Sequence, residues 1–142
     1  MPELMEVQKV SVVWSMTSLE SGRFAPGERS SELSDLASNF NQLRSRGQGY
    51  LEVRLPDRPF PQLTLGFRDD CAVIHLFTDE ESVSLLVGDG KLPPDTPVEV
   101  PILDDLTEFT GDFALSVDHA WDTVRNFAQA RTSEELGEWC EL

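Results

Sequence analysis

Long apolar runs are missing from the 142-residue sequence, in which no stretch reaches the roughly 18 apolar residues that a membrane-spanning helix requires. The opening residues, Met-Pro-Glu-Leu-Met-Glu, also lack the basic segment and the apolar stretch of a signal peptide. We therefore expect a soluble, cytoplasmic protein with no membrane partner.

Cysteine is scarce. Only Cys71 and Cys140 are present, which would allow one disulfide bond but not the framework of bridges that holds small secreted domains together. We expect both side chains to be reduced and buried, as small apolar residues of a cytoplasmic protein.

The sequence also lacks the motifs that mark common enzymes. There is no glycine-rich phosphate loop, no Cys-x-x-Cys, no paired histidine spacing and no Gly-x-Ser-x-Gly. Only His75 and His119 could act as bases near neutral pH, and we expect His75 in an apolar strand and His119 on a helix surface. The acid pairs at 69–70 and 104–105 lack the spacing of a calcium loop. We therefore expect no catalysis, no cofactor and no metal, and a small hydrolase or metal-dependent enzyme is only a third alternative.

Basic residues are nearly absent from the later half of the chain. Residues 1–68 hold eight acids and eight bases, whereas residues 69–142 hold eighteen acids against three bases. The later half therefore carries the whole formal charge of −15. Such a distribution predicts a negative surface that repels nucleic acid and attracts a basic protein. The alternative is that the acids only keep a small protein soluble.

The composition is that of one globular domain spanning residues 1–142. Hydrophobic residues make up 39% and charged residues 26%, and no repeat, low-complexity tract or long linker divides the chain. Apolar stripes at helical spacing predict two main helices. The first is expected to be capped by Ser30 or Ser31 and to end near Gly47, and the second to be capped by Ser116.

Alternating or continuous apolar runs predict the strands. We place them at residues 7–14, 50–55, 63–67, 71–77 and 83–87, with a short edge strand at 98–100, while Trp139 either pairs in a last strand or only packs its ring. Residues 18–29 contain Gly22, Pro26 and Gly27 and are predicted to form a loop. The predicted fold is α+β, an antiparallel β-meander sheet of about five to six strands with two main helices packed on one face.

Acidic residues gather in the predicted turns between these strands. We expect adjacent turns of the meander to project from one edge, so that their carboxylates converge on a patch that faces a basic partner. Leu103, Leu106 and Phe109 interleave with the acids and either anchor the partner or tuck their loop onto the core. The predicted partner-binding residues are Asp69, Asp70, Asp79, Glu80, Glu81, Asp89, Asp104, Asp105, Glu108, Phe109 and Asp112.

The closing part of the chain resembles a known family. The stretch Leu115–Trp121 (LSVDHAW), the later Phe127 and the ending from Trp139 to Glu141 are similar to the first-described immunity-protein family of bacterial polymorphic toxin systems. The resemblance implies an immunity protein whose cognate toxin is a nucleic-acid-targeting deaminase or nuclease. The hypothesis from the sequence is that an acidic surface of this chain, expected to be monomeric, neutralises such a toxin. The alternative is an acidic adaptor or chaperone-like protein that binds a basic partner.

Overall fold

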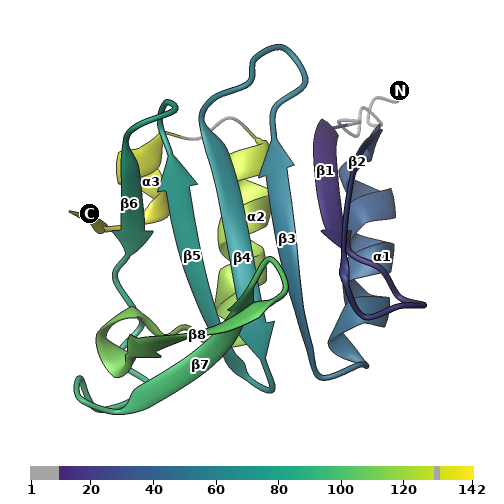
Figure 1. The fold of residues 1–142 in the computed structure, drawn as a ribbon. Coiled ribbons are helices and arrows are strands. Elements are labelled where there is room, and N and C mark those ends of the chain that lie inside the picture. Colours follow the sequence, from purple (N-terminus) through teal and green to yellow (C-terminus); the bar gives the residue numbers. More distant parts are fainter. Residues whose placement is uncertain (1–9, 130–131) are drawn as a thin grey trace, which may run out of the picture.

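A computed structural model describes residues 10–129 and 132–142. Within these residues the chain forms an α+β fold in which a seven-stranded antiparallel sheet has helices on one face and a β-hairpin across the other (Figure 1). The strand order is β2-β1-β3-β4-β5-β6-β9. The strands are β1 (Ser11–Thr17), β2 (Phe24–Glu32), β3 (Gln48–Arg54), β4 (Gln62–Arg68), β5 (Cys71–Phe77), β6 (Val83–Leu86) and β9 (Trp139–Glu141).

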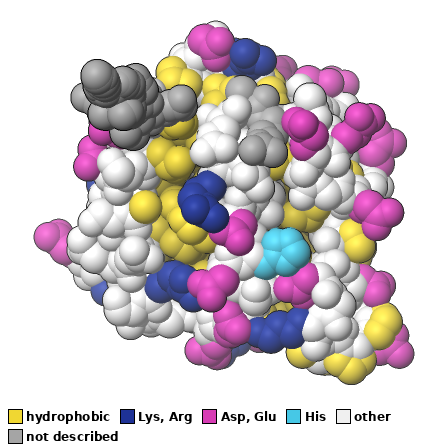
Figure 2. Space-filling view, turned by 180° about the vertical axis from the view of Figure 1, so that it is seen from behind, with side chains coloured by type: hydrophobic (Ala, Val, Ile, Leu, Met, Phe, Trp, Pro, Cys, Tyr) yellow, Lys and Arg dark blue, Asp and Glu magenta, His cyan; other side chains and the backbone are white. Residues whose placement is uncertain are grey.

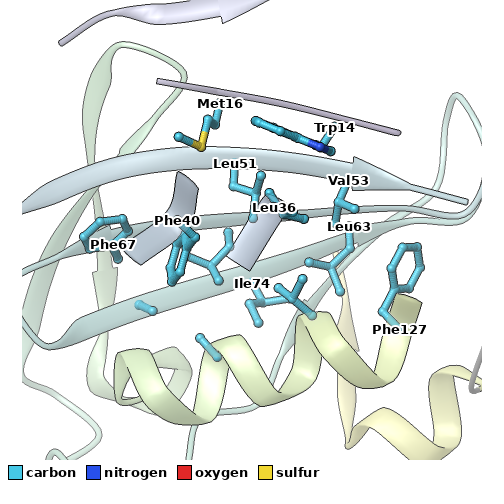
Figure 3. Close-up of a cluster of buried hydrophobic side chains, with 14 of the residues drawn as sticks. Trp14, Met16, Leu36, Phe40, Leu51, Val53, Leu63, Phe67, Ile74 and Phe127 are labelled. Atoms are coloured by element: carbon cyan, nitrogen blue, oxygen red, sulfur yellow. The ribbon is translucent and has the colours of Figure 1, made fainter. Parts of the chain in front are cut away.

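The helices α1 (Leu33–Arg44) and α2 (Val117–Ala128) cover one face of the sheet and enclose the larger core (Figure 3). Phe40 of α1 lies at its centre, with its ring edge-on to Phe67 at 5.5 Å between centroids and stacked on Trp121 of α2 at 4.9 Å. Because truncating a buried phenylalanine costs about 3–5 kcal/mol, this contact is a major link between both helices and the sheet. The prediction of two main helices on one face is confirmed.

The opposite face is covered by the hairpin of β7 (Pro97–Ile102) and β8 (Asp105–Thr110). Val98 and Val100 of this hairpin pack against Val73 and Leu85 of the sheet in a second, smaller core. Strand β5 therefore has apolar neighbours on both faces, which suits its continuous run of apolar residues.

The hairpin approaches the sheet most closely at Gly66 of β4. A Cβ atom at this position would lie 2.3 Å from the carbonyl oxygen of Pro101, which is far inside van der Waals contact. Glycine is therefore required here for the backbone of β7 to rest on the sheet.

Three parts of the predicted secondary structure are wrong. Residues 24–29 are not a loop but part of β2, which pairs with β1 at the sheet edge, where Pro26 needs no donor for a further strand. Ser30 and Ser31 belong to β2, so α1 begins after Glu32 without a side-chain cap. The expected edge strand at 98–100 pairs not with the main sheet but with β8, a strand that was not predicted.

The end of the chain completes the sheet. Ser116 caps α2 by accepting a hydrogen bond from the backbone N–H of His119, as predicted. A short helix α3 (Ser133–Leu136) follows α2, and Trp139 pairs with Leu86 in β9, which confirms one of the two alternatives for the tail. Cys140 is exposed and Cys71 half-buried, so the expectation that both are buried is wrong, and both are free thiols.

No helix of the described residues is long and apolar enough to cross a membrane. The first part of the strand predicted at 7–14, residues 7–9, lies outside the described residues.

Replacing Gly66 with alanine tests the contact between hairpin and sheet. We expect Gly66→Ala to lower the free energy of unfolding by about 2 kcal/mol, because the new methyl group forces β7 away from the sheet. Gly27→Ala is the control, since a Cβ atom there would have no neighbour within 4 Å. Urea denaturation of both variants measures the difference, and equal midpoints would show that the close approach is not required.

Candidate functional site

The predicted acidic residues do not form one patch. Consecutive turns of an antiparallel sheet lie at opposite ends of the strand between them, so the expectation that adjacent turns share an edge is wrong. The turn at 69–70 precedes β5 and the turn at 78–82 follows it, which separates them by the length of a seven-residue strand, roughly 20 Å (Figure 1). The predicted residues therefore divide into separate groups.

Two of the predicted acids, Asp70 and Asp89, hold the beginning of α2 in place. Asp70 accepts a hydrogen bond from the backbone N–H of Val117 at 3.1 Å and pairs with Lys91. Asp89 accepts from the backbone N–H of Ser116 at 2.9 Å. Because the first N–H groups of a helix have no partner within the helix, these carboxylates supply what the fold requires there.

The local charges keep both carboxyl groups ionised. The hydrogen bond from Lys91, helped by the amide of Val117, lowers the pKa of Asp70 below its usual value. Burial pushes the pKa of Asp89 upward, but amide hydrogen bonds from Ser116 and Lys91, together with nearby His119, outweigh burial and lower this pKa as well. The Asp89 side chain is only 15% exposed, which leaves little of it for a partner.

His75 and Phe109 meet where β8 covers the sheet. The two rings pack edge-on with their centroids 5.6 Å apart, and the half-buried imidazole has a lowered pKa because burial disfavours its charged form. The ring of Phe109 is itself half-buried. For Phe109 the alternative expectation is therefore the better one, because its ring holds the hairpin on the sheet.

The tip of the hairpin combines exposed leucines with carboxylates. Leu103 is 46% exposed and Leu106 is 48% exposed, although both are large apolar residues. Asp104 and Asp105 lie between them, and Glu108 follows on the exposed side of β8. We call this set the acidic hairpin surface, and it consists of Leu103, Asp104, Asp105, Leu106 and Glu108.

The backbone of Leu103 is strained. Ile102 pairs with Asp105, so Leu103 and Asp104 form a two-residue turn in which Leu103 has a φ of 60°. The left-handed region costs a non-glycine residue about 1–2 kcal/mol, and turns of this kind favour glycine or asparagine. A leucine in this conformation with an exposed side chain points to a role outside folding.

Basic residues lie near the acidic hairpin surface: Arg46 lines a hollow together with Leu103 and Asp104, and Arg68 pairs with Glu99 at 3.4 Å. Among residues 10–129 and 132–142, no basic side chain forms an ion pair with Asp104, Asp105 or Glu108. Glu108 stands directly opposite Glu99 in the hairpin, an arrangement that destabilises a strand pair. The carboxylate of Asp104 accepts the backbone N–H of Phe24 at 2.7 Å, which fixes the tip against β2.

The remaining predicted residues lie elsewhere. Asp79 accepts hydrogen bonds from the backbone N–H groups of Glu81 and Ser82, each at 2.8 Å, and so shapes its own turn. Glu80 and Glu81 are exposed beside it. Exposed Asp69 stays at the turn between β4 and β5, and Asp112 is exposed on the short 3-10 helix η1 (Gly111–Phe113).

The sequence analysis missed a second group of acids. Glu141 of β9 pairs with Ser84 of β6, so the end of the chain lies next to the turn at 78–82. Residues 132–142 hold four acids and no base. In the view of Figure 2, acidic side chains line the edge at the right, on the side of β6 and α3. Only the pairing of the Trp139 strand could have revealed this neighbourhood.

No group of three or more histidine, cysteine or acidic residues in the described ranges is arranged to hold a metal ion. His119 approaches Asp89 with its Nδ1 3.5 Å from the carboxylate, and its side chain is about half exposed on the first turn of α2. What the arrangement offers is a set of carboxylates beside exposed apolar side chains, which is suited to binding a basic protein.

Replacing Asp89 with alanine tests its role at α2. We expect Asp89→Ala to lower the free energy of unfolding at pH 7 by about 1–3 kcal/mol, because it leaves the Ser116 N–H unpaired. The folded-state pKa of Asp89 lies below the unfolded value, so its contribution is present above pH 4 and is lost as the pH falls through the folded pKa. The wild type and the variant should therefore converge in acid.

Asp112→Ala is the matched control, because it removes an exposed acid of the same predicted set whose carboxylate makes no hydrogen bond within the described residues. Thermal denaturation across pH 2–7 makes the comparison. An equal loss of stability in both variants would show that Asp89 does not stabilise the start of α2.

Comparison with known proteins adds no relative to these observations: no protein-family model matches the chain, and no curated protein matches it.

Proposed function

We propose that this protein is an immunity protein that neutralises a bacterial toxin by binding its basic surface through the acidic hairpin surface. The observation that carries the proposal is the exposure of Leu103 and Leu106 on either side of Asp104 and Asp105, two carboxylates that form no ion pair within the described residues. Apolar anchors supply most of the affinity of a protein interface, while charges around them speed the encounter and select the partner.

The chemistry of the carboxylates suits a toxin that acts on nucleic acid. Such a toxin must hold substrate phosphates with arginine or lysine side chains. Asp105 and Glu108 are both exposed on β8 and can form charge-assisted hydrogen bonds with those same side chains. In this proposal the hairpin takes the place of the substrate backbone in the toxin's cleft.

The way in which the hairpin is held on the sheet also supports the proposal. The hairpin is fixed along its inner side by Val98, Val100 and the ring of Phe109, so its outer side is presented on a rigid base. A surface that is ordered before binding loses little conformational entropy when the partner arrives. A rigid hairpin therefore favours tight binding even when the contact area with the partner is small.

Charge reversal on the hairpin tests the proposal in cells that also express the cognate toxin, whose gene we propose lies beside that of this chain. We expect Asp105→Lys with Glu108→Lys to abolish protection and to weaken toxin binding at least about tenfold, because both changes place cations against a basic surface. The control is Asp118→Lys with Asp122→Lys, which makes the same change in charge on α2, behind the sheet.

Growth after toxin induction and the dissociation constant of the purified pair are the two measurements. If protection is kept after charge reversal on the hairpin but lost after charge reversal on α2, the hairpin is not the binding site. Capture of a basic partner that is not a toxin, with no toxicity to neutralise, would instead favour the adaptor alternative.

The strained leucine provides a separate test of the anchor. We expect Leu103→Asn to leave the free energy of unfolding within about 1 kcal/mol of the wild type, because asparagine tolerates the left-handed conformation and offsets the lost apolar contact. Toxin binding should still fall at least about tenfold. Urea denaturation and calorimetric titration measure the two effects, and unchanged affinity would show that Leu103 is not an anchor.

A further inference from the structure

A pocket of about 270 Å³ opens at the end of the sheet farthest from the turn at 69–70, on the side of the helices. Its walls come from the loop between β3 and β4, the end of β5, the end of α2, and α3. Leu55, Leu76, Phe127 and Leu136 supply most of the apolar lining. Figure 3 shows Phe127 projecting from the end of α2 beside Leu63 of the sheet.

The walls of the pocket are set by the core. Leu55, Leu76 and Phe127 are each buried, and Leu76 and Phe127 belong to the same cluster that holds α2 on the sheet. Leu136 packs against that cluster from α3, whose first turn is held by the capping box of Thr132 and Glu135. The pocket is therefore formed before any ligand arrives, as is usual for binding sites.

Acidic residues flank the pocket in sequence, although none of them lines it. Thr78 and Ser133 line the opening, and each is followed directly by acids, Asp79 in the β5–β6 turn and Glu134 in α3. Residues 78–82 hold three acids and residues 132–142 hold four, with no base in either segment. The turn acids Asp79, Glu80 and Glu81 belong to the predicted set, whereas the acids of residues 132–142 were not predicted.

One cation also lines the pocket, the guanidinium of Arg58. Asp57 neutralises this charge with two hydrogen bonds, from Nε of Arg58 to Oδ1 at 3.1 Å and from a terminal nitrogen to Oδ2 at 3.2 Å. Among the described residues, the carboxylates of the turn and of α3 therefore outnumber the cations near the opening. A fatty acid or a phosphate would be repelled, whereas lysine and arginine would be attracted.

We infer that this pocket receives one apolar side chain from a partner protein segment in which lysine or arginine residues flank that side chain. The apolar walls take the side chain, and the carboxylates of the turn and of α3 bind the flanking cations. The pocket is large enough for a single aromatic ring, the kind of anchor that concentrates binding energy at protein interfaces.

This second docking surface does not depend on the acidic hairpin surface, which lies on the opposite face of the sheet (Figure 1). Both surfaces share the preference for basic partners. Only the pocket adds a requirement for one inserted apolar side chain.

The probe is the peptide acetyl-Lys-Arg-Phe-Arg-Lys-amide, titrated into the isotope-labelled full chain and followed by NMR. We expect the backbone amides of Thr78, Ser133 and Leu136 to shift. Replacing the central phenylalanine with alanine should weaken binding at least about tenfold, and a peptide with glutamates in place of the four basic residues should not bind.

Two variants place the binding in the pocket. Ser133→Phe fills the opening with a ring of its own, and Glu80→Lys with Glu134→Lys reverses charge at the rim without touching the walls. Each change should weaken peptide binding at least about tenfold. Asp105→Lys with Glu108→Lys is the control on the hairpin and should leave peptide affinity unchanged.

Equal binding of the phenylalanine and alanine peptides would overturn the inference, because it would reduce the contact to diffuse charge attraction. Shifts confined to the hairpin would overturn it as well. If the NMR spectrum shows that Ser133→Phe does not fold, the peptide affinity of the variant Glu80→Lys with Glu134→Lys tests the inference instead. The result does not depend on any toxin, so failure here is distinct from failure of the immunity function.

Discussion

The structure depends on covering both faces of β5. Ile74 and its neighbours on one face pack under the helices, while Val73 on the other requires the hairpin. Because exposed apolar surface costs roughly 25 cal/mol per Å², neither face can stay open to water. The hairpin is thus held on the sheet by its inner side and must present its outer side to solvent. The turn and the exposed positions of β8 carry the carboxylates and leucines of the acidic hairpin surface.

The sequence predicted those elements whose signals are local. The second helix is an example, since Ser116 caps it and a stripe from Val117 to Phe127 buries it, and the structure agrees closely. Prediction from the sequence failed for strands whose position depends on pairing with another strand. Strand β2 contains Pro26 and Gly27, which normally break strands, yet its place at the sheet edge tolerates both. Strand β8 is polar and exposed, so only its partner β7 defines it.

The candidate site was predicted only in part, for the same reason. Charge could be counted from the sequence, but its placement follows from strand direction, and antiparallel turns alternate between the two ends of a sheet. Asp70 and Asp89 turned inward to α2, a contact across more than twenty residues that no local pattern encodes. The acids beside β9 became neighbours of the β5–β6 turn only because β9 pairs with β6. The hairpin acids, in contrast, lie beside exposed leucines, although nothing in the sequence chose between an anchor and a core contact.

The central claim is that the outer side of the β7–β8 hairpin binds the toxin. Amide hydrogen exchange of the chain, alone and with the cognate toxin proposed for it, tests this claim most directly because the measurement reports every segment at once. The account predicts strong additional protection in residues 102–108 and little change along α1 and α2. Protection that spares the hairpin and appears instead on the helices or at β2 would contradict it.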